Sequence, residues 1–122
     1  MNEIAEALKE RALRFALQVG RFCRTLPDTF EGRHVRNQLF RCSTSTAANY
    51  HAACRARSHR DFVAKMGLVV EESDEAVFWL TFLKRAEMDD NPELDPLTGE
   101  ARELLAIFSA SAKTASSNCH QH

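Results

Sequence analysis

The sequence predicts an all-α protein, an antiparallel four-helix bundle with up-down-up-down topology. Four stretches carry apolar residues at alternating spacings of three and four, which places them on one face of a helix. The breaks between these stretches contain proline, glycine or helix-capping residues, and no stretch alternates like a strand. The connections are short, which favours antiparallel neighbours. We expect helices at about 3–25, 33–56, 59–88 and 96–115, in a single domain over residues 1–115.

The first two predicted helices differ in the character of their inward faces. The first carries a large apolar stripe of Ile4, Leu8, Ala12, Phe15, Val19, Phe22 and Leu26. Pro27 and the residues after it end this helix. The second carries a smaller and more polar stripe of Val35, Leu39, Cys42, Thr46, Asn49 and Ala53. Its hydroxyl run at 43–46 is a poor helix former in isolation, so we expect tertiary packing to hold it helical.

The last two predicted helices have recognisable starting signals. Ser58 and Asp61 form a pattern like a capping box at the third helix, whose stripe is Phe62, Met66, Val69, Ser73, Ala76, Leu80 and Leu83. In the fourth, Asp95 is the predicted N-cap and Pro96 the first helical residue. Its stripe is Leu97, Ala101, Leu104, Phe108, Ser111 and Ala115. We expect the polar tail at 116–122 to be disordered.

Composition places the chain among globular proteins, with 44% hydrophobic and 27% charged residues in 122. The N-terminus lacks the basic start and apolar run of a signal peptide, and no apolar run is long enough for a membrane span. These features predict a cytoplasmic protein with no membrane partner. The four cysteines Cys23, Cys42, Cys54 and Cys119 are therefore expected to be reduced, with Cys42 as a small core residue.

Nothing in the sequence is typical of an active site, so we expect no enzyme, no cofactor and no metal. The only Glu-x-x-His match, Glu31 to His34, has no second copy of the kind that di-iron bundles require. The acidic cluster 71–75 has no histidine at ligand spacing. His51 lies off the inward stripe of its helix and is expected to be exposed. A metal-dependent enzyme stays open as a third hypothesis.

Charge is distributed unevenly along the chain. Residues 33–65 hold seven Lys and Arg against one acid, whereas residues 66–103 hold eleven acids against three bases. A phosphate backbone is one partner that suits the basic segment. Its candidate residues are Arg33, Arg36, Arg41, Arg55, Arg57 and Arg60. Alternatively, these bases pair with the acidic half of the same molecule or of a neighbouring subunit.

Several motifs from the second and third predicted helices resemble those of a known family. They are Gln38 with Arg41, Ser45 with Asn49, and Arg57-Ser58 before Asp61-Phe62, followed by the acidic run 71–75 and Trp79-Leu80. In these motifs the chain is similar to the bacterial four-helix bundle family first noticed as ribosomal-RNA intervening-sequence proteins. The resemblance covers about residues 35–83. Ala47 and the pair Ala52-Ala53 depart from the Pro and Glu-Gly of many members, which indicates a variant branch.

The resemblance implies an antiparallel four-helix bundle that assembles into a homo-oligomer, typically a five-membered ring, and it does not imply an enzyme. It also implies a structural role for the motif residues Gln38, Ser45, Asn49, Ser58, Asp61 and Phe62. In one branch of the family, the accessory proteins of diversity-generating retroelements, a basic ring surface engages nucleic acid and a reverse transcriptase. RNA or DNA, and a reverse transcriptase or another protein from a neighbouring gene, are therefore the implied partners.

Two function hypotheses follow. The first is an oligomeric scaffold or adaptor that binds RNA or DNA backbone through the basic segment. The second is a pure protein–protein interaction module in which the same segment meets acids of a neighbouring subunit and no nucleic acid is bound.

Overall fold

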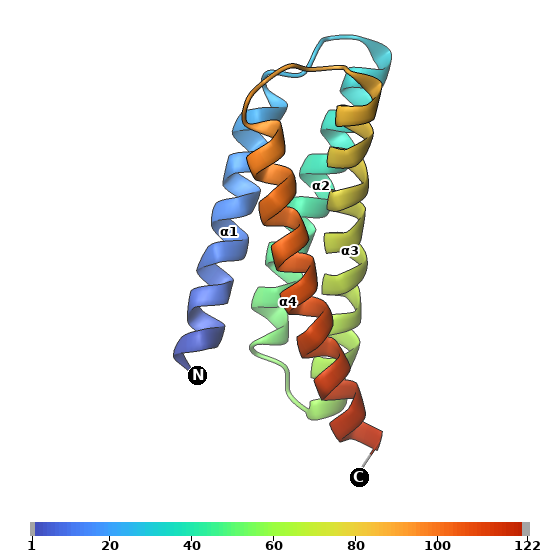
Figure 1. Ribbon diagram of the computed structural model, residues 1–122. Helices are drawn as coiled ribbons and strands as arrows, with labels where there is room; N and C mark the ends of the chain where they lie inside the picture. The colour runs from blue at the N-terminus through green and yellow to red at the C-terminus, as the bar shows by residue number, and fades with distance from the viewer. Residues whose placement is uncertain (1, 121–122) are drawn as a thin grey trace.

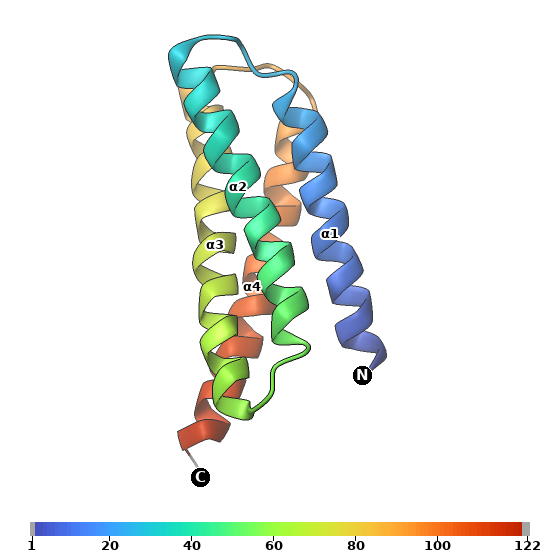
Figure 2. The same cartoon turned by 180° about the vertical axis from the view of Figure 1, so that it is seen from behind.

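The chain folds into four antiparallel helices that pack side by side in a bundle. A computed structural model describes residues 2–120, with helices α1 (Glu3–Cys23), α2 (Phe30–Ala53), α3 (His59–Ala86) and α4 (Leu94–His120). α2 packs between α1 and α3, and α4 packs on α3 and, less extensively, on α1 (Figure 1 and Figure 2). No strand occurs within this described range, so the predicted fold class is confirmed.

The two ends of the bundle are built differently, and each is named here by its connections. The loop end contains the α1–α2 connection (24–29) and the α3–α4 connection (87–93). The turn end contains the start of α1, the α2–α3 connection (54–58) and the last part of α4 (Figure 1). No helix within the described residues is long and apolar enough to cross a membrane.

The core follows the predicted heptad stripes closely. Its fully buried large side chains come from all four helices and include Val19, Leu39, Met66, Leu83 and Phe108. Burial of each such side chain contributes about 1.5–3 kcal/mol relative to exposure. The clearest departure is Ile4, which belongs to the predicted stripe of α1 but is 80% exposed at the turn end. Four other stripe residues are half-buried, namely Leu8, Asn49, Phe62 and Ser111. Most of each predicted stripe is therefore buried in the core.

α2 begins three residues earlier than predicted, because Thr29 supplies an N-cap. The Thr29 Oγ1 atom accepts a hydrogen bond from the Gly32 N–H at 3.1 Å. Gly32 consequently lies inside the first helical turn instead of ending the loop. A Cβ atom at this position would lie 2.1 Å from the Pro27 carbonyl oxygen, so only glycine allows the connection to fold back this closely.

The start of α3 confirms the predicted cap. Ser58 Oγ accepts from the Asp61 N–H at 3.0 Å. The Asp61 carboxylate reaches back to the N–H of Arg57, at 3.4 Å, and not to that of Ser58. The short Asp side chain therefore completes a modified capping box around the α2–α3 turn.

The prediction for α4 was wrong at its first residue. The helix begins at Leu94, so Asp95 is not the N-cap; its carboxylate accepts a hydrogen bond from Lys84 Nζ at 3.2 Å. Pro96 is tolerated because the N–H groups of the first turn have no intrahelical acceptor.

The C-terminal end of α4 also differs from the prediction of a disordered tail at 116–122. The backbone stays helical through His120, because Ser and Asn cost only tenths of a kcal/mol each in a helix that is already formed. Residues 121 and 122 lie outside the described residues, as do the side chains of 118–120, which include Cys119.

The hydroxyl run of α2 is helical, and two of its hydroxyls form hydrogen bonds within the helix. Thr46 Oγ1 donates to the Cys42 carbonyl at 2.7 Å, and Thr44 Oγ1 donates to the Phe40 carbonyl at 2.8 Å. These bonds satisfy the hydroxyls inside the helix itself. Ser43 Oγ is buried and forms no hydrogen bond within the described structure.

Candidate nucleic-acid interface

The six candidate arginines do not form one surface. They lie along α2, from the loop end to the turn end, and continue into the α2–α3 turn and the start of α3. A helix of 24 residues is about 36 Å long, so Arg33 and Arg55 are far apart. The basic segment of the sequence is therefore divided in space into three parts.

The part in the first half of α2 is largely neutralised by acids of the same molecule. Arg33 Nη1 lies 2.9 Å from Asp28 Oδ1 in the loop before its helix. Arg41 bridges to α3, with Glu72 Oε2 at 3.0 Å from Nη1 and Glu75 paired to Nη2. The hydrogen bond to Glu75, with Glu72 adding to it, raises the pKa of Arg41. For Arg41, pairing with the acidic half of the chain is thus the observed arrangement.

Arg36 is half-buried and faces α1. Its carbonyl oxygen accepts from Cys23 Sγ at 3.7 Å. Burial raises the pKa of the Cys23 thiol to about 11, and the positive charge of Arg36 opposes that rise. Arg36 therefore lies against the α1–α2 contact and away from the other candidates at the turn end.

Arg55, Arg57 and Arg60 form the third part, at the turn end. All three are exposed, and none has a carboxylate within ion-pair distance in the described part of the chain. We call these three residues the arginine turn.

The nearby acid, Asp61, is engaged by other groups. Its carboxylate accepts from Lys65 Nζ at 2.7 Å and from the Arg57 N–H, and these bonds lower the pKa of Asp61. His59, between the arginines, is tied by Nε2 to the Ala115 carbonyl at 2.8 Å. The residues beside the arginines, His59 and Asp61, are therefore held by hydrogen bonds, while the three arginines themselves are exposed.

The family-motif residues fall on the contact between α2 and α3 and on the turn that joins them. Arg41 Nε donates to Gln38 Oε1 at 3.3 Å, and Asn49 Nδ2 donates to the Ser45 carbonyl at 2.9 Å. Ser58 and Asp61 cap α3, as described above, and Phe62 packs half-buried against the core. The motif residues thus lie along α2 and at the capped start of α3, next to the arginine turn.

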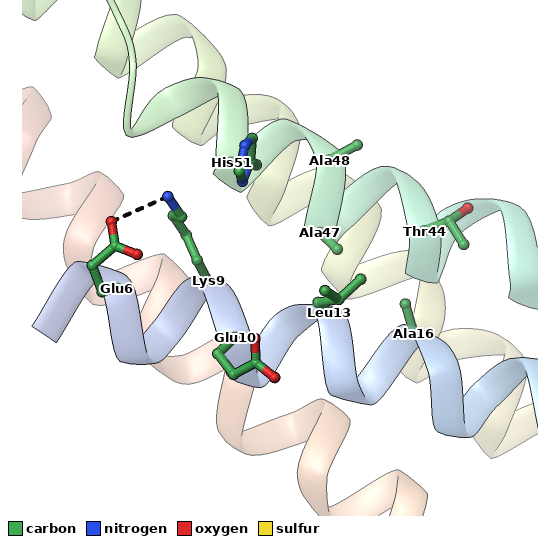
Figure 3. A pocket seen from close by; sticks show the side chains of 9 residues that line it. All are labelled: Glu6, Lys9, Glu10, Leu13, Ala16, Thr44, Ala47, Ala48 and His51. Carbon is green, nitrogen blue, oxygen red and sulfur yellow. Dashed lines mark hydrogen bonds and ion pairs between the residues drawn. The ribbon is translucent and has the colours of Figure 1, made fainter.

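Two apolar surfaces were missed by reasoning from the sequence. The first is a groove of about 340 Å³ between α1 and α2, where Leu13 and Ala16 face Ala47 (Figure 3). Leu13 is 50% exposed, and an ion pair between Lys9 and Glu6 lies at one end of the groove. His51 is exposed, as predicted, and borders the same groove.

The second surface is an aromatic cluster on α3 beside α2. Phe78 and Phe82 are 56% and 40% exposed, and both rings contact Trp79 edge-on. The His34 ring meets Trp79 from α2, with centroids 5.4 Å apart. The signal for both surfaces was present in the sequence as large apolar residues outside the heptad stripes. It could not be told from ordinary surface exposure without knowing which of them lie side by side.

A candidate metal centre is not evident in the described part of the chain. No group of three or more His, Cys, Asp or Glu side chains is placed there to hold a metal ion. Glu31 and His34, the sole Glu-x-x-His match, are both exposed at the start of α2.

Together, the fold and the site define a four-helix bundle that presents an unpaired arginine turn at one end. The sequence matches the model of the 23S rRNA-intervening sequence protein family over residues 6–110, and the chain belongs to this family. This confirms the resemblance inferred from the motifs of α2 and α3.

Among solved structures, the chain is similar to a protein of unknown function from the S23 ribosomal protein family of Bacteroides thetaiotaomicron. The TM-score is 0.79 at 24% sequence identity, over 89% of this chain and 97% of that chain. This likeness shows a shared fold. No curated protein matches the sequence.

Proposed function

We propose that this chain is a non-catalytic, homo-oligomeric scaffold or adaptor of the cytoplasm that contacts the phosphate backbone of RNA or DNA through Arg55, Arg57 and Arg60. The observation that carries the proposal is the contrast among the six candidates. Arg33 and Arg41 form ion pairs with carboxylates of the same chain, whereas the three residues of the arginine turn are exposed and form no ion pair in the described structure.

Unpaired guanidinium groups suit a phosphate partner for two reasons. Their planar fork matches phosphate geometry bidentately, and no internal ion pair has to be broken before they bind. Three cations in the α2–α3 connection and the first turn of α3 are a modest site for one protomer. An oligomer that repeats the turn would increase avidity without adding a new kind of contact.

The apolar surfaces support the homo-oligomeric part of the proposal. The α1–α2 groove and the aromatic cluster lie on two different sides of α2. A closed ring needs two different complementary patches on each subunit, whereas a two-fold dimer uses one patch twice. Two distinct apolar surfaces therefore suit the ring that the family resemblance implies, with five members as the expected number.

The test is a salt titration of binding to a short RNA hairpin and to a DNA duplex, for the wild type and two double variants. Log affinity for the duplex should fall with log salt by about 0.9 per phosphate neutralised. Arg55→Gln with Arg57→Gln should weaken binding and reduce the slope by about two.

The matched control is Arg33→Gln with Arg41→Gln, which removes the same charge from arginines that are already paired. We expect it to change the slope little. Equal affinity and slope for the wild type and the Arg55/Arg57 variant would overturn the assignment of nucleic-acid binding to the arginine turn.

The second candidate function, a protein–protein interaction module without nucleic acid, is favoured by the same exposed apolar surfaces. It predicts that the arginine turn meets acids of a neighbouring subunit, so that high salt loosens the oligomer. Multi-angle light scattering at low and high salt, with and without the RNA hairpin, distinguishes the two candidate functions. An oligomer that dissociates in high salt and ignores RNA would favour this second function.

A further inference from the structure

A polar groove runs between α1 and α4 in the half of the bundle near the loop end. It consists of two adjoining hollows of about 360 and 390 Å³, which share Gln18, Glu93 and Leu97 in their linings. Toward the turn end the same two helices diverge, and an apolar cleft of about 490 Å³ opens beside them (Figure 1 and Figure 2). Charged side chains line the groove, whereas none lines the cleft.

Hydrogen bonds join the two walls of the groove at both of its ends. At one end, Arg11 donates to both carboxylate oxygens of Glu100, at 2.7 Å each. At the other, Thr25 Oγ1 donates to Asp89 at 3.0 Å and accepts from Asn91 Nδ2 at 3.2 Å. These bonds tie α1 to α4 and to the α3–α4 connection, so the walls of the groove are held in place.

The groove contains one positive and one negative charge that are not neutralised. Arg21 and Glu93 line the same hollow, and both are exposed. Neither forms an ion pair with the other or with any other residue between 2 and 120. Gln18 lines this hollow as well, and its side-chain amide forms no hydrogen bond within the same range. Groups of opposite charge thus surround one space without pairing with each other.

The floor of the groove is apolar. Phe15 lines one hollow, Phe22 lines the other, and Leu97 lines both. All three are buried residues of the core, so only their edges face the groove. An apolar surface with a few polar groups that fix orientation is the usual composition of a small-molecule site.

We propose that this groove binds a small zwitterion of the amino acid and short peptide class, whose carboxylate pairs with Arg21 and whose ammonium group pairs with Glu93. A guanidinium matches a carboxylate with two parallel hydrogen bonds. A simple anion would be repelled by Glu93 and a simple cation by Arg21, whereas a ligand with both charges satisfies both groups. An apolar side chain of the ligand would lie on Phe22 and Leu97. The inference goes beyond the proposed function, because the groove lies away from the arginine turn and its ligand is not a nucleic acid.

The experiment is a ligand titration of the full chain, followed by NMR of its backbone amides. Leucine and leucylleucine carry both charges, N-acetylleucine lacks the ammonium group, and leucinamide lacks the carboxylate. The zwitterions should shift the amide signals of the residues that line the groove. They should bind about tenfold more tightly than either blocked form, which loses one charge-assisted bond. Tighter binding of leucylleucine than of leucine identifies short peptides as the ligands, and the reverse order identifies free amino acids.

Two substitutions test the charges one at a time. Arg21→Gln should abolish the preference for leucine over leucinamide, because the carboxylate loses its partner. Glu93→Gln should abolish the preference for leucine over N-acetylleucine, because the ammonium group loses its partner. Both side chains are exposed, so both variants should fold, and circular dichroism verifies this.

The matched controls are Arg24→Gln and Asp90→Asn. They remove the same charges from exposed residues that are close by in the chain but do not line the groove. Both should bind leucine as the wild type does. Equal affinity of the wild type for leucine and for both blocked forms would overturn the proposal, as would equal losses in the Arg21 and Arg24 variants. Amide signals along the groove that stay unchanged at about 10 mM of either zwitterion would overturn it too.

The outcome is independent of nucleic-acid binding. Arg21→Gln should bind the RNA hairpin as the wild type does, and the Arg55/Arg57 variant should bind leucine as the wild type does. Failure of the groove proposal and failure of the proposed function therefore give different results.

Discussion

The loop end and the turn end of this bundle are built from the same four helices but are closed to different degrees. At the loop end the two connections are hydrogen-bonded to each other, because Thr25 Oγ1 donates to Asp89 at 3.0 Å and accepts from Asn91 Nδ2 at 3.2 Å. Leu83 and Leu94 are buried beneath them. At the turn end, Ile4 stays exposed and the arginine turn is unpaired. The loop end is thus closed by hydrogen bonds and buried leucines, whereas the turn end exposes an apolar side chain and three arginines.

The largest effect on the free energy of unfolding is expected from a matched pair of truncations in the predicted apolar stripes. Leu83→Ala removes a fully buried side chain at the loop end and should lower the free energy of unfolding by about 2–5 kcal/mol. Ile4→Ala removes a side chain that is 80% exposed at the turn end and should cost only about 0.5 kcal/mol or less. Urea denaturation followed by circular dichroism measures both. Equal losses would show that the turn end is as closed as the loop end.

A second pair tests how tightly the α1–α2 connection is folded. Gly32→Ala places a methyl group against the Pro27 carbonyl, and we expect a loss of about 1–3 kcal/mol. Gly67→Ala is its control, because nothing lies within 4 Å of a Cβ atom there and the position is helical. That substitution should stabilise by about 0.5–1 kcal/mol. Similar midpoints of thermal unfolding for both variants would contradict the close approach between residue 32 and the Pro27 carbonyl.

A third pair compares a paired arginine with an unpaired one on neighbouring parts of the chain. Arg41→Gln leaves Glu72 and Glu75 close together without their shared cation, and should destabilise by about 0.5–1 kcal/mol at low salt. Arg55→Gln breaks no ion pair in the described structure and should leave the free energy of unfolding unchanged. The difference in free energy of unfolding between the two variants should shrink at high salt, because salt screens exposed ion pairs. A salt-independent difference would mean that Arg41 acts through packing.

The smallest expected effect concerns thiols in the closed core. Burial raises the pKa of Cys23 to about 11 and that of Cys42 to about 12. Both thiols therefore stay protonated in the native state at pH 8, and a thiol reagent should modify half-exposed Cys54 first in a Cys119→Ser background.

The same raised pKa values give a pH dependence of stability. An unfolded cysteine releases its proton near pH 8.5, whereas native Cys42 keeps it until about pH 12. Stability should accordingly fall as pH rises through this interval. Cys42→Ala should flatten the dependence, and an unchanged slope would contradict the pKa assignment.

Much of this architecture was readable from local patterns. The alternating three-four spacing placed Leu39, Met66 and Phe108 in the core, and Ser58 was identified as a cap from its position before an apolar run. The family motif likewise lies in contiguous helical turns. Boundaries were less predictable, because the cap at Thr29 lies before the apolar stripe of α2 and α4 begins at Leu94, before the first residue of its predicted stripe.

The sequence by itself determined the four helices, their inward faces and the excess of arginine between residues 33 and 65, since these depend on residue type and spacing along one chain. Only the tertiary structure decided which arginines are available. Arg41 meets Glu72 and Glu75 because α2 and α3 pack side by side, whereas the arginine turn extends beyond the reach of the acidic half. It also decided that α1 diverges from α4 and leaves a cleft. Ion pairs and clefts depend on distances between helices, which a pattern within a single helix does not contain.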